Sequence, residues 1–286
     1  LVPDFTLAKT RQLYKYHFKK NHLDIGVGGY KMDEVDGYDN WVWPDVATFP
    51  SGTSAEQMRQ MYGSMVQKMT ADWYKEINKR TYGLVRASNA GGSHLPYVIY
   101  NDYYNHKDFI TALVNSSFVG VLWTPEVRAS KTAEEWIRRM QSACFSPMAM
   151  INAWADGTKP WTFPEVADAV KDVANLRMQL LPYLYTTFAA YHREGKPPFR
   201  AMQLVDGFVS QNVQERGQFD ATQNPYQMAI RKDIKDQYMM GDAILVAPMC
   251  AGEKTRNVIL PKGKWYDFYT GVFVGENQII QIEPSL

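Results

Sequence analysis

The sequence predicts an α/β fold in which parallel strands alternate with helices, followed by a smaller β-rich segment. Short and almost wholly apolar runs alternate with longer amphipathic stretches in residues 1–240, as parallel strands covered on both faces require. Residues 241–286 lose the helical period and contain short β-rich runs separated by turns rich in Gly, Pro and Asn. With 286 residues, 45% of them apolar, the chain is long enough to bury a substantial core.

The helices are predicted from capping residues and from apolar positions that recur every three or four residues. Thr6 can cap a first helix that runs to Lys20, and Ser54 with Gln57 forms a capping box for a second helix. The apolar face of this second helix consists of Met58, Met61, Met65, Met69, Trp73 and Ile77. Such a stripe is typical of a core-facing helix rather than of a cofactor site.

Two more helices are expected farther along the chain. Thr132 and Glu135 mark the start of one of them. The other is a single long helix that begins near Pro164, with apolar positions that continue to Phe188.

Five apolar runs are predicted strands, and each one leads into polar residues. The runs are 28–33, 81–88, 97–102, 118–123 and 148–154, and the polar residues are Asp33, Arg86, Asp102, Glu126 and Asn152. A single buried charge is most often a structural ion pair. Five polar groups at successive strand ends indicate a site instead, because the carboxyl ends of the strands of a (β/α) barrel meet at one pocket.

The residue types at these strand ends favour glycoside hydrolysis. No histidine lies there, which argues against a Ser-His-Asp arrangement, and the chain has no phosphate-binding glycine motif. Two carboxylates can serve as nucleophile and acid/base at an anomeric carbon, and aromatic rings stack on the apolar faces of sugars. Aromatic residues make up 14% of the chain, and several fall in loops.

Roles follow from the positions of these residues. We expect Asp33 to be the nucleophile, kept ionised by Lys31 and Arg86, and Asp102 to be the acid/base, with Glu126 as the competing carboxylate. The indoles Trp41, Trp43 and Trp123 either line the sugar pocket or seal the mouth of the barrel.

No metal or cofactor is expected. The acidic stretch "DEVDGYD", which holds Asp33, Glu34, Asp36 and Asp39, lacks the ligand spacing of a calcium-binding loop. The near-neutral net charge of +1 argues against a nucleic-acid partner, and no apolar run is long enough to span a membrane. The sequence does not determine the cellular compartment, and a soluble periplasmic or secreted protein is compatible with it.

Several motifs in order resemble glycoside hydrolase family 31, the retaining α-glycosidases. The segment "GVGGYKMDEVDG" is similar to the family's nucleophile motif and places the nucleophile at Asp33. "RASNAG" resembles the stretch that carries the substrate-binding arginine, which corresponds to Arg86, and "VIYND" is similar to the acid/base segment, with Asp102. "LRMQLLPYLYTTFAAYHREGKPPFRAM" and "GDAILVAPM" resemble later parts of the family's catalytic and C-terminal domains.

The departures from the family pattern concern the sugar. Glu126 stands where many members have an aspartate, Asn152 replaces a sugar-binding histidine, and a different loop with Asp36 follows the nucleophile. The combination is most similar to the bacterial α-galactosidase branch. An exo-acting α-galactosidase on terminal α-linked hexose is therefore expected. The alternatives are an α-glucosidase or α-glycosyltransferase of the same family, or a non-catalytic carbohydrate-binding relative.

The resemblance also implies a domain plan. Residues 1–240 resemble the part of a (β/α)8 TIM-type barrel from the strand-four region onward, and residues 241–286 resemble the start of a C-terminal β-sandwich domain. We therefore expect a piece of a longer protein, whose preceding N-terminal part completes the barrel. The other expected partner is an oligosaccharide or glycoside substrate.

Overall fold

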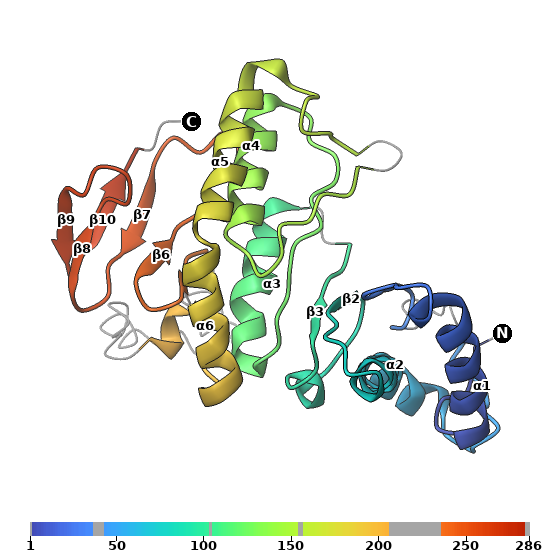
Figure 1. Ribbon diagram of the computed structural model, residues 1–286. Coiled ribbons are helices and arrows are strands. Elements are labelled where there is room, and N and C mark those ends of the chain that lie inside the picture. The colour runs from blue at the N-terminus through green and yellow to red at the C-terminus, as the bar shows by residue number, and fades with distance from the viewer. Residues whose placement is uncertain (1, 37–42, 103–104, 154–156, 206–235, 284–286) are drawn as a thin grey trace, which may run out of the picture. The chain divides into compact units, whose positions relative to one another are not determined.

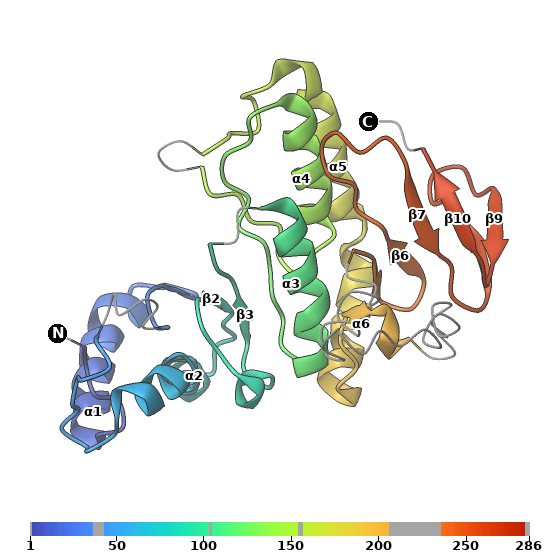
Figure 2. The ribbon, with the colours of Figure 1, turned by 180° about the vertical axis from the view of Figure 1, so that it is seen from behind.

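The computed structural model describes residues 2–36, 43–102, 105–153, 157–205 and 236–283 (Figures 1 and 2). The chain forms two compact units. Unit 1 consists of residues 1–102 and 119–126, and unit 2 consists of residues 103–118 and 127–286. Both units contain helices and strands, which confirms the predicted α/β class. The predicted domain boundary at 240/241 stays a prediction.

Unit 1 contains the parallel sheet that the apolar runs predicted. Its strands are β1 (Lys31–Met32), β2 (Gly83–Val85) and β3 (Tyr97–Ile99), in the order β1-β2-β3. Both strand pairs are parallel, and a parallel bridge between Ile99 and Trp123 adds the next run beyond β3. The fourth run was expected to be a strand from residue 118, but a helix continues to Val119 and ends before Gly120, whose φ of +75° favours glycine.

The first helix lacks the cap that the sequence predicted. Helix α1 (Ala8–Phe18) is followed by a π-helical turn, Lys19–Leu23, and its N-cap position is Leu7 rather than Thr6. The Thr6 hydroxyl donates to Asp4 Oδ1 at 2.5 Å and is therefore engaged ahead of the helix. The expectation for Thr6 was wrong because a nearby carboxylate competes for its hydroxyl.

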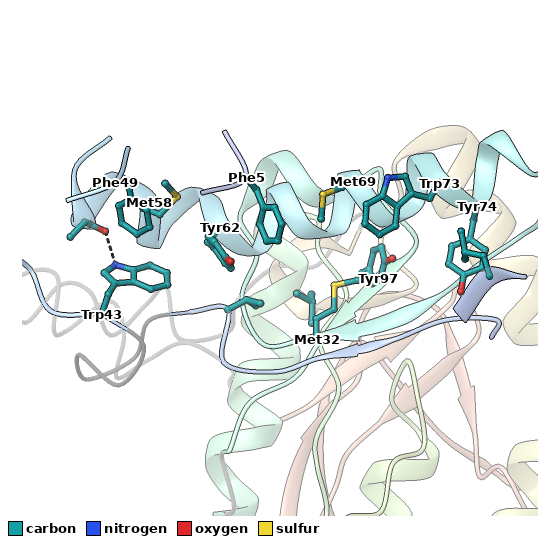
Figure 3. Close-up of a cluster of buried hydrophobic side chains, with 14 residues drawn as sticks. Phe5, Met32, Trp43, Phe49, Met58, Tyr62, Met69, Trp73, Tyr74 and Tyr97 are labelled. Carbon is teal, nitrogen blue, oxygen red and sulfur yellow. Dashed lines mark hydrogen bonds between the residues drawn. The ribbon is translucent and has the colours of Figure 1, made fainter. Parts of the chain in front are cut away.

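Helix α2 (Ala55–Glu76) packs its apolar stripe against the sheet. The Ser54 side chain accepts a hydrogen bond from the Gln57 amide at 3.2 Å, which confirms the predicted cap. Figure 3 shows Met69 and Trp73 of this helix facing Met32 of β1 and Tyr97 of β3 within one buried cluster. Most of the stripe is core as predicted, but Met61 is 40% exposed.

Four helices belong wholly or mainly to unit 2. They are α3 (His106–Val119), α4 (Ala133–Cys144), α5 (Ala167–Gln179) and α6 (Leu181–Glu194). Helices α4 and α5 lie side by side (Figures 1 and 2), and Thr132 caps α4 through the Glu135 amide as predicted. The single long helix expected after Pro164 is interrupted at Leu180. Pro182 lacks the amide hydrogen that would continue α5, and it stands instead in the first turn of α6, where none is needed.

The rest of unit 2 is rich in strands, as the sequence predicted. A parallel bridge joins Val127 to Ile151. The antiparallel strands are β4 (Phe199–Ala201), β5 (Tyr238–Met240), β6 (Ile244–Val246), β7 (Arg256–Ile259), β8 (Lys264–Tyr266), β9 (Phe273–Glu276) and β10 (Ile279–Ile282). They form the sheets β4-β5-β6, β7-β10 and β8-β9. Of the helices within the described ranges, none combines the length and the apolar character needed to cross a lipid bilayer.

Candidate active site

The candidate site lies in unit 1, where the three parallel strands end. Met32 is paired with Val85, and Val85 is paired with Ile99. The ladder continues one step farther, because the Arg86 amide donates to the Met32 carbonyl at 3.0 Å and the Tyr100 amide donates to the Val85 carbonyl at 3.0 Å. The residues that follow the three strands are therefore one row of neighbours across the sheet.

Arg86 is the centre of this site and contacts three carboxylates. Its Nη1 donates to Asp102 Oδ2 at 2.6 Å and to Asp33 Oδ1 at 3.4 Å, and its Nε donates to Asp36 Oδ2 at 3.1 Å. Partial burial disfavours the charged guanidinium, but the ion pairs with Asp102 and Asp36 outweigh this effect and raise the pKa of Arg86. The cation therefore stays charged and holds all three carboxylates at one point.

The shared guanidinium nitrogen limits the distance between the two predicted catalytic carboxylates. Because one Nη1 atom contacts both groups, Asp33 Oδ1 and Asp102 Oδ2 cannot be farther apart than the sum of 3.4 Å and 2.6 Å. This limit applies to one oxygen of each carboxylate and is compatible with the spacing of roughly 5 to 5.5 Å between the carboxyl groups of retaining pairs.

The Asp33 carboxylate is oriented by its own backbone. The Glu34 amide donates to Asp33 Oδ1 at 3.0 Å, and Arg86 also approaches this oxygen. Glu34 has a φ of +54°, in the left-handed region that non-glycine residues seldom occupy. The chain thus turns sharply directly after Asp33, and the two observed hydrogen bonds converge on one of its two oxygens.

A second charge pair lies beside this cluster. Lys31 Nζ is 3.2 Å from Glu126 Oε1 and 4.6 Å from the centroid of the Tyr100 ring, a cation–π distance. Glu126 is only 2% exposed, so its charge is buried and depends on partners such as Lys31. The structure thus brings together Lys31, Asp33, Asp36, Arg86, Asp102 and Glu126 from the predicted site.

Two of the three indoles predicted for the pocket, Trp43 and Trp123, are buried. Trp43 is 4% exposed, and its Nε1 donates to the Ala55 carbonyl at 3.1 Å, the dashed line in Figure 3. Its ring lies edge-on to Phe49 and Tyr62 in the core, which favours the sealing role over sugar stacking. Trp123 is also buried and donates to Asn101 Oδ1 at 3.2 Å. Trp41 lies outside the described residues.

Asn152 and Asp39 are the remaining residues that the sequence singled out. Asn152 belongs to unit 2, where its backbone N–H donates to the Val127 carbonyl at 2.8 Å. Asp39 lies outside the described residues. Within the ranges that the structure describes, no three His, Cys, Asp or Glu side chains are arranged to hold a metal ion.

Tyr100 is the site residue that the sequence reasoning missed. It stands in the predicted strand 97–102, and strand alternation puts it on the same face as Asp102. A search limited to charged strand ends passes over a phenol. The register with Asp33 and Arg86 is the signal that identifies it.

Two family profiles match this chain. Residues 1–187 match the Glycosyl hydrolases family 31 TIM-barrel domain, and residues 221–285 match the Glycosyl hydrolase family 31 C-terminal domain. Together these ranges cover most of the chain and agree with the predicted order, a barrel segment followed by a β-rich domain.

Curated relatives align with nearly the whole chain. Alpha-glucosidase 2 of Bacillus thermoamyloliquefaciens is 28% identical over 99% of this chain and 36% of its own length. Alpha-xylosidase of Saccharolobus solfataricus is 27% identical over 96% of this chain and 38% of its own length. Isomaltosyltransferase of Sporosarcina globispora is 24% identical over 95% of this chain and 25% of its own length. The chain thus spans between a quarter and two fifths of these relatives.

Solved structures show the same fold at low identity. A family 31 sulfoquinovosidase from E. rectale superposes with a TM-score of 0.76 at 17% identity, covering 99% of this chain and 42% of that one. A family 31 α-xylosidase from a soil metagenome gives a TM-score of 0.76 at 22% identity, covering 98% of this chain and 44% of that one.

Proposed function

Because the chain belongs to glycoside hydrolase family 31, we propose that the protein containing it is an exo-acting retaining α-glycosidase. The observation that supports the proposal is the single Arg86 nitrogen that contacts both Asp33 and Asp102, which is compatible with the spacing of a retaining pair. The whole protein's activity is proposed here from a chain that spans a minor part of its relatives' length.

Asp33 acts as the nucleophile in this proposal. Its carboxylate attacks the anomeric carbon and forms a glycosyl ester, while Asp102 donates a proton to the departing glycosidic oxygen. Asp102 then removes a proton from water, which attacks the anomeric carbon and returns the bonding electron pair to Asp33. The turn at Glu34 supports the first role, because it fixes the carboxylate before any substrate arrives.

Asp102 is proposed as the acid/base in preference to Glu126. Asp102 is 40% exposed at its side chain and shares Arg86 with the nucleophile, so a leaving group can reach it. Glu126 is buried and paired with Lys31, which suits a positioning role better than proton exchange with substrate and water.

The proposed substrate is a terminal α-linked hexose, with α-glucosides as the first candidate. The names of the relatives, which include α-glucosidases, an α-xylosidase and an isomaltosyltransferase, support this alternative better than the α-galactosidase that the sequence departures suggested. An α-galactosidase is the second candidate. The pairing of Lys31 with the buried Glu126, at a position where the family pattern differs, is the observation in its favour.

The test uses the longest natural polypeptide that contains these 286 residues. We expect turnover of aryl α-glycosides, measured across a matched panel of α-glucoside, α-xyloside and α-galactoside, with retention of anomeric configuration by proton NMR. Asp33→Asn should abolish turnover of every substrate, because it removes the attacking carboxylate. Asp102→Ala should still form the glycosyl-enzyme from glycosyl fluorides, whose leaving group needs no proton, and added azide should restore turnover, because azide attacks without a general base.

Several outcomes would contradict the proposal. Full activity in Asp33→Asn would remove the nucleophile assignment. Failure of Asp102→Ala to form the glycosyl-enzyme from the fluoride and to respond to azide, with both results obtained in Glu126→Ala, would pass the acid/base role to Glu126. Absence of turnover on the whole panel, with sugar binding detected by calorimetry, would favour the non-catalytic relative. Transfer of the glycosyl group to an added sugar instead of water would favour a glycosyltransferase.

A further inference from the structure

Tyr100 occupies a place in the site that the proposed mechanism does not yet use. It follows β3 directly, in the row that continues from Asp33 after β1 and Arg86 after β2. Side chains in one row of a parallel sheet project to the same face. The phenol therefore lies on the face of the sheet that carries the proposed nucleophile.

The Tyr100 hydroxyl is buried without a hydrogen-bond partner. The residue is 0% exposed, and no described residue meets its hydroxyl oxygen within hydrogen-bond geometry. Leaving a buried hydroxyl unpaired is unfavourable, so such a group calls for a reason. The ring itself is held by Lys31, whose ammonium lies 4.6 Å from its centroid and 3.2 Å from Glu126.

Asp33 is the acceptor that lies near this hydroxyl. Burial raises the pKa of Tyr100, and the adjacent carboxylates of Asp33 and Glu126 raise it further, with Arg86 opposing them. The phenol thus keeps its proton and can only be a donor toward a carboxylate. Asp33 also acts on the pKa of Tyr100 as a side-chain hydrogen-bond partner, although their contact does not meet full hydrogen-bond geometry. Catalytic hydrogen bonds of this kind tighten when the reacting charge develops.

We propose that Tyr100 is a positioning residue whose hydroxyl donates a hydrogen bond to the Asp33 carboxylate during turnover. This inference rests on the proposed function, because it assigns a partner to the nucleophile. The bond matters most when the glycosyl ester breaks, since the electron pair of the C–O bond returns to Asp33 and its negative charge develops again. A donor already aimed at that oxygen stabilises the charge without reorganisation.

The test compares Tyr100→Phe with the wild-type polypeptide. Phenylalanine keeps the ring, its burial and the Lys31 contact, and removes only the hydroxyl. We expect kcat for an aryl α-glycoside with a good leaving group to fall roughly tenfold or more, in the range found for removal of one transition-state donor. KM should fall in parallel, because slower breakdown lets the glycosyl-enzyme accumulate, and the thermal midpoint should not fall. After trapping with a fluorinated glycosyl fluoride, reactivation of the glycosyl-enzyme should slow by a similar factor.

Tyr97→Phe is the matched control on the same strand. The Tyr97 hydroxyl lies 2.5 Å from Thr70 Oγ1 in the core beneath helix α2, on the other face of the sheet. This variant also loses one buried phenol, so it should be less stable, but its kcat and reactivation rate should match the wild type.

Each remaining outcome decides the question. Unchanged kcat and reactivation in Tyr100→Phe would overturn the inference and leave Tyr100 as a packing residue. A raised KM with unchanged kcat, different for glucosides and galactosides, would overturn it in favour of a contact with the sugar. Turnover by the wild type that is abolished in Asp33→Asn would support the proposed function independently of Tyr100. Either of the two Tyr100→Phe results above would then count against the Tyr100 inference alone. A wild-type protein without turnover would remove both proposals.

Discussion

A methyl group added at Gly29 should disturb the strand that carries the nucleophile. A Cβ at this position would lie 2.0 Å from the Tyr82 carbonyl oxygen, which belongs to the backbone leading into β2. Ordinary carbon–oxygen contacts are longer by more than 1 Å, and a backbone atom cannot rotate away as a side chain can. Gly29→Ala must therefore push β1 away from β2, and with it Asp33 away from Arg86.

The adjacent glycine supplies the control. A Cβ at Gly28 would meet nothing within 4 Å, so Gly28→Ala makes the same chemical change three positions before β1 without the clash. Overpacking typically costs about 1 to 3 kcal/mol, whereas replacing an unstrained glycine by alanine gains roughly 0.4 to 1 kcal/mol through the unfolded chain. The two variants should therefore differ in unfolding free energy by at least about 1.5 kcal/mol.

The assay is urea unfolding followed by circular dichroism, together with kcat/KM on the best aryl glycoside of the panel. We expect Gly29→Ala to unfold at lower urea than the wild type and to lose activity. Gly28→Ala should unfold at the wild-type concentration or slightly above it and should keep its activity. Equal unfolding midpoints for the two variants would refute the reasoning, because the close approach of Gly29 to Tyr82 would then have no energetic consequence.

Trp43, the Lys31–Glu126 pair and His106 each allow a further test. Trp43→Ala should cost about 3 to 5 kcal/mol in unfolding free energy, with KM nearly unchanged, as expected for a core ring; a raised KM with unchanged stability would instead support sugar stacking. In a double-mutant cycle by urea unfolding, Lys31→Met and Glu126→Gln should show a coupling of about 0.5 to 3 kcal/mol, and additive effects would mean that the 3.2 Å pair is not an energetic unit. Burial and Arg139 lower the pKa of His106 to about 4. Between pH 6.5 and 4 the unfolded chain therefore binds more protons at this residue than the folded protein does. Stability should therefore fall by up to roughly 3 kcal/mol as the pH drops through this window, and His106→Gln should flatten that part of the curve.

The parallel sheet and its strand-end site could be predicted because they depend on short-range patterns. Period-two alternation puts Lys31 and Asp33 on one face, and parallel pairing then brings Arg86 beside Asp33. Apolar runs and caps such as Ser54 and Thr132 are equally local, and both caps are formed. Each of these features needs only a few neighbouring residues in the sequence.

Some of the features that the sequence did not predict involve contacts between distant segments. Thr6 has the residue type of a cap, but its hydroxyl is bound to Asp4, whose other oxygen accepts from the Ser51 amide across 47 positions. Trp43 follows the nucleophile in the chain, yet its indole bonds to Ala55 and is covered by the core. An aromatic ring in a polar stretch suggests sugar stacking, but only the fold shows whether the face of that ring is exposed.

Arg86 links the charge states of the two proposed catalytic residues. It contacts Asp102 at 2.6 Å and Asp33 at 3.4 Å through one nitrogen, so the two carboxylates share a single cation. In the proposed mechanism Asp102 must carry a proton before it can protonate the leaving oxygen, and a neutral acid binds a guanidinium more weakly than a carboxylate does. Protonation of Asp102 thus leaves more of the Arg86 charge to Asp33 and Asp36. Asp36 then keeps Arg86 in place through Nε while its Nη1 exchanges partners. In the proposed mechanism Asp36 therefore has a role although it is not one of the catalytic pair: it anchors Arg86 while Asp33 and Asp102 change charge in turn.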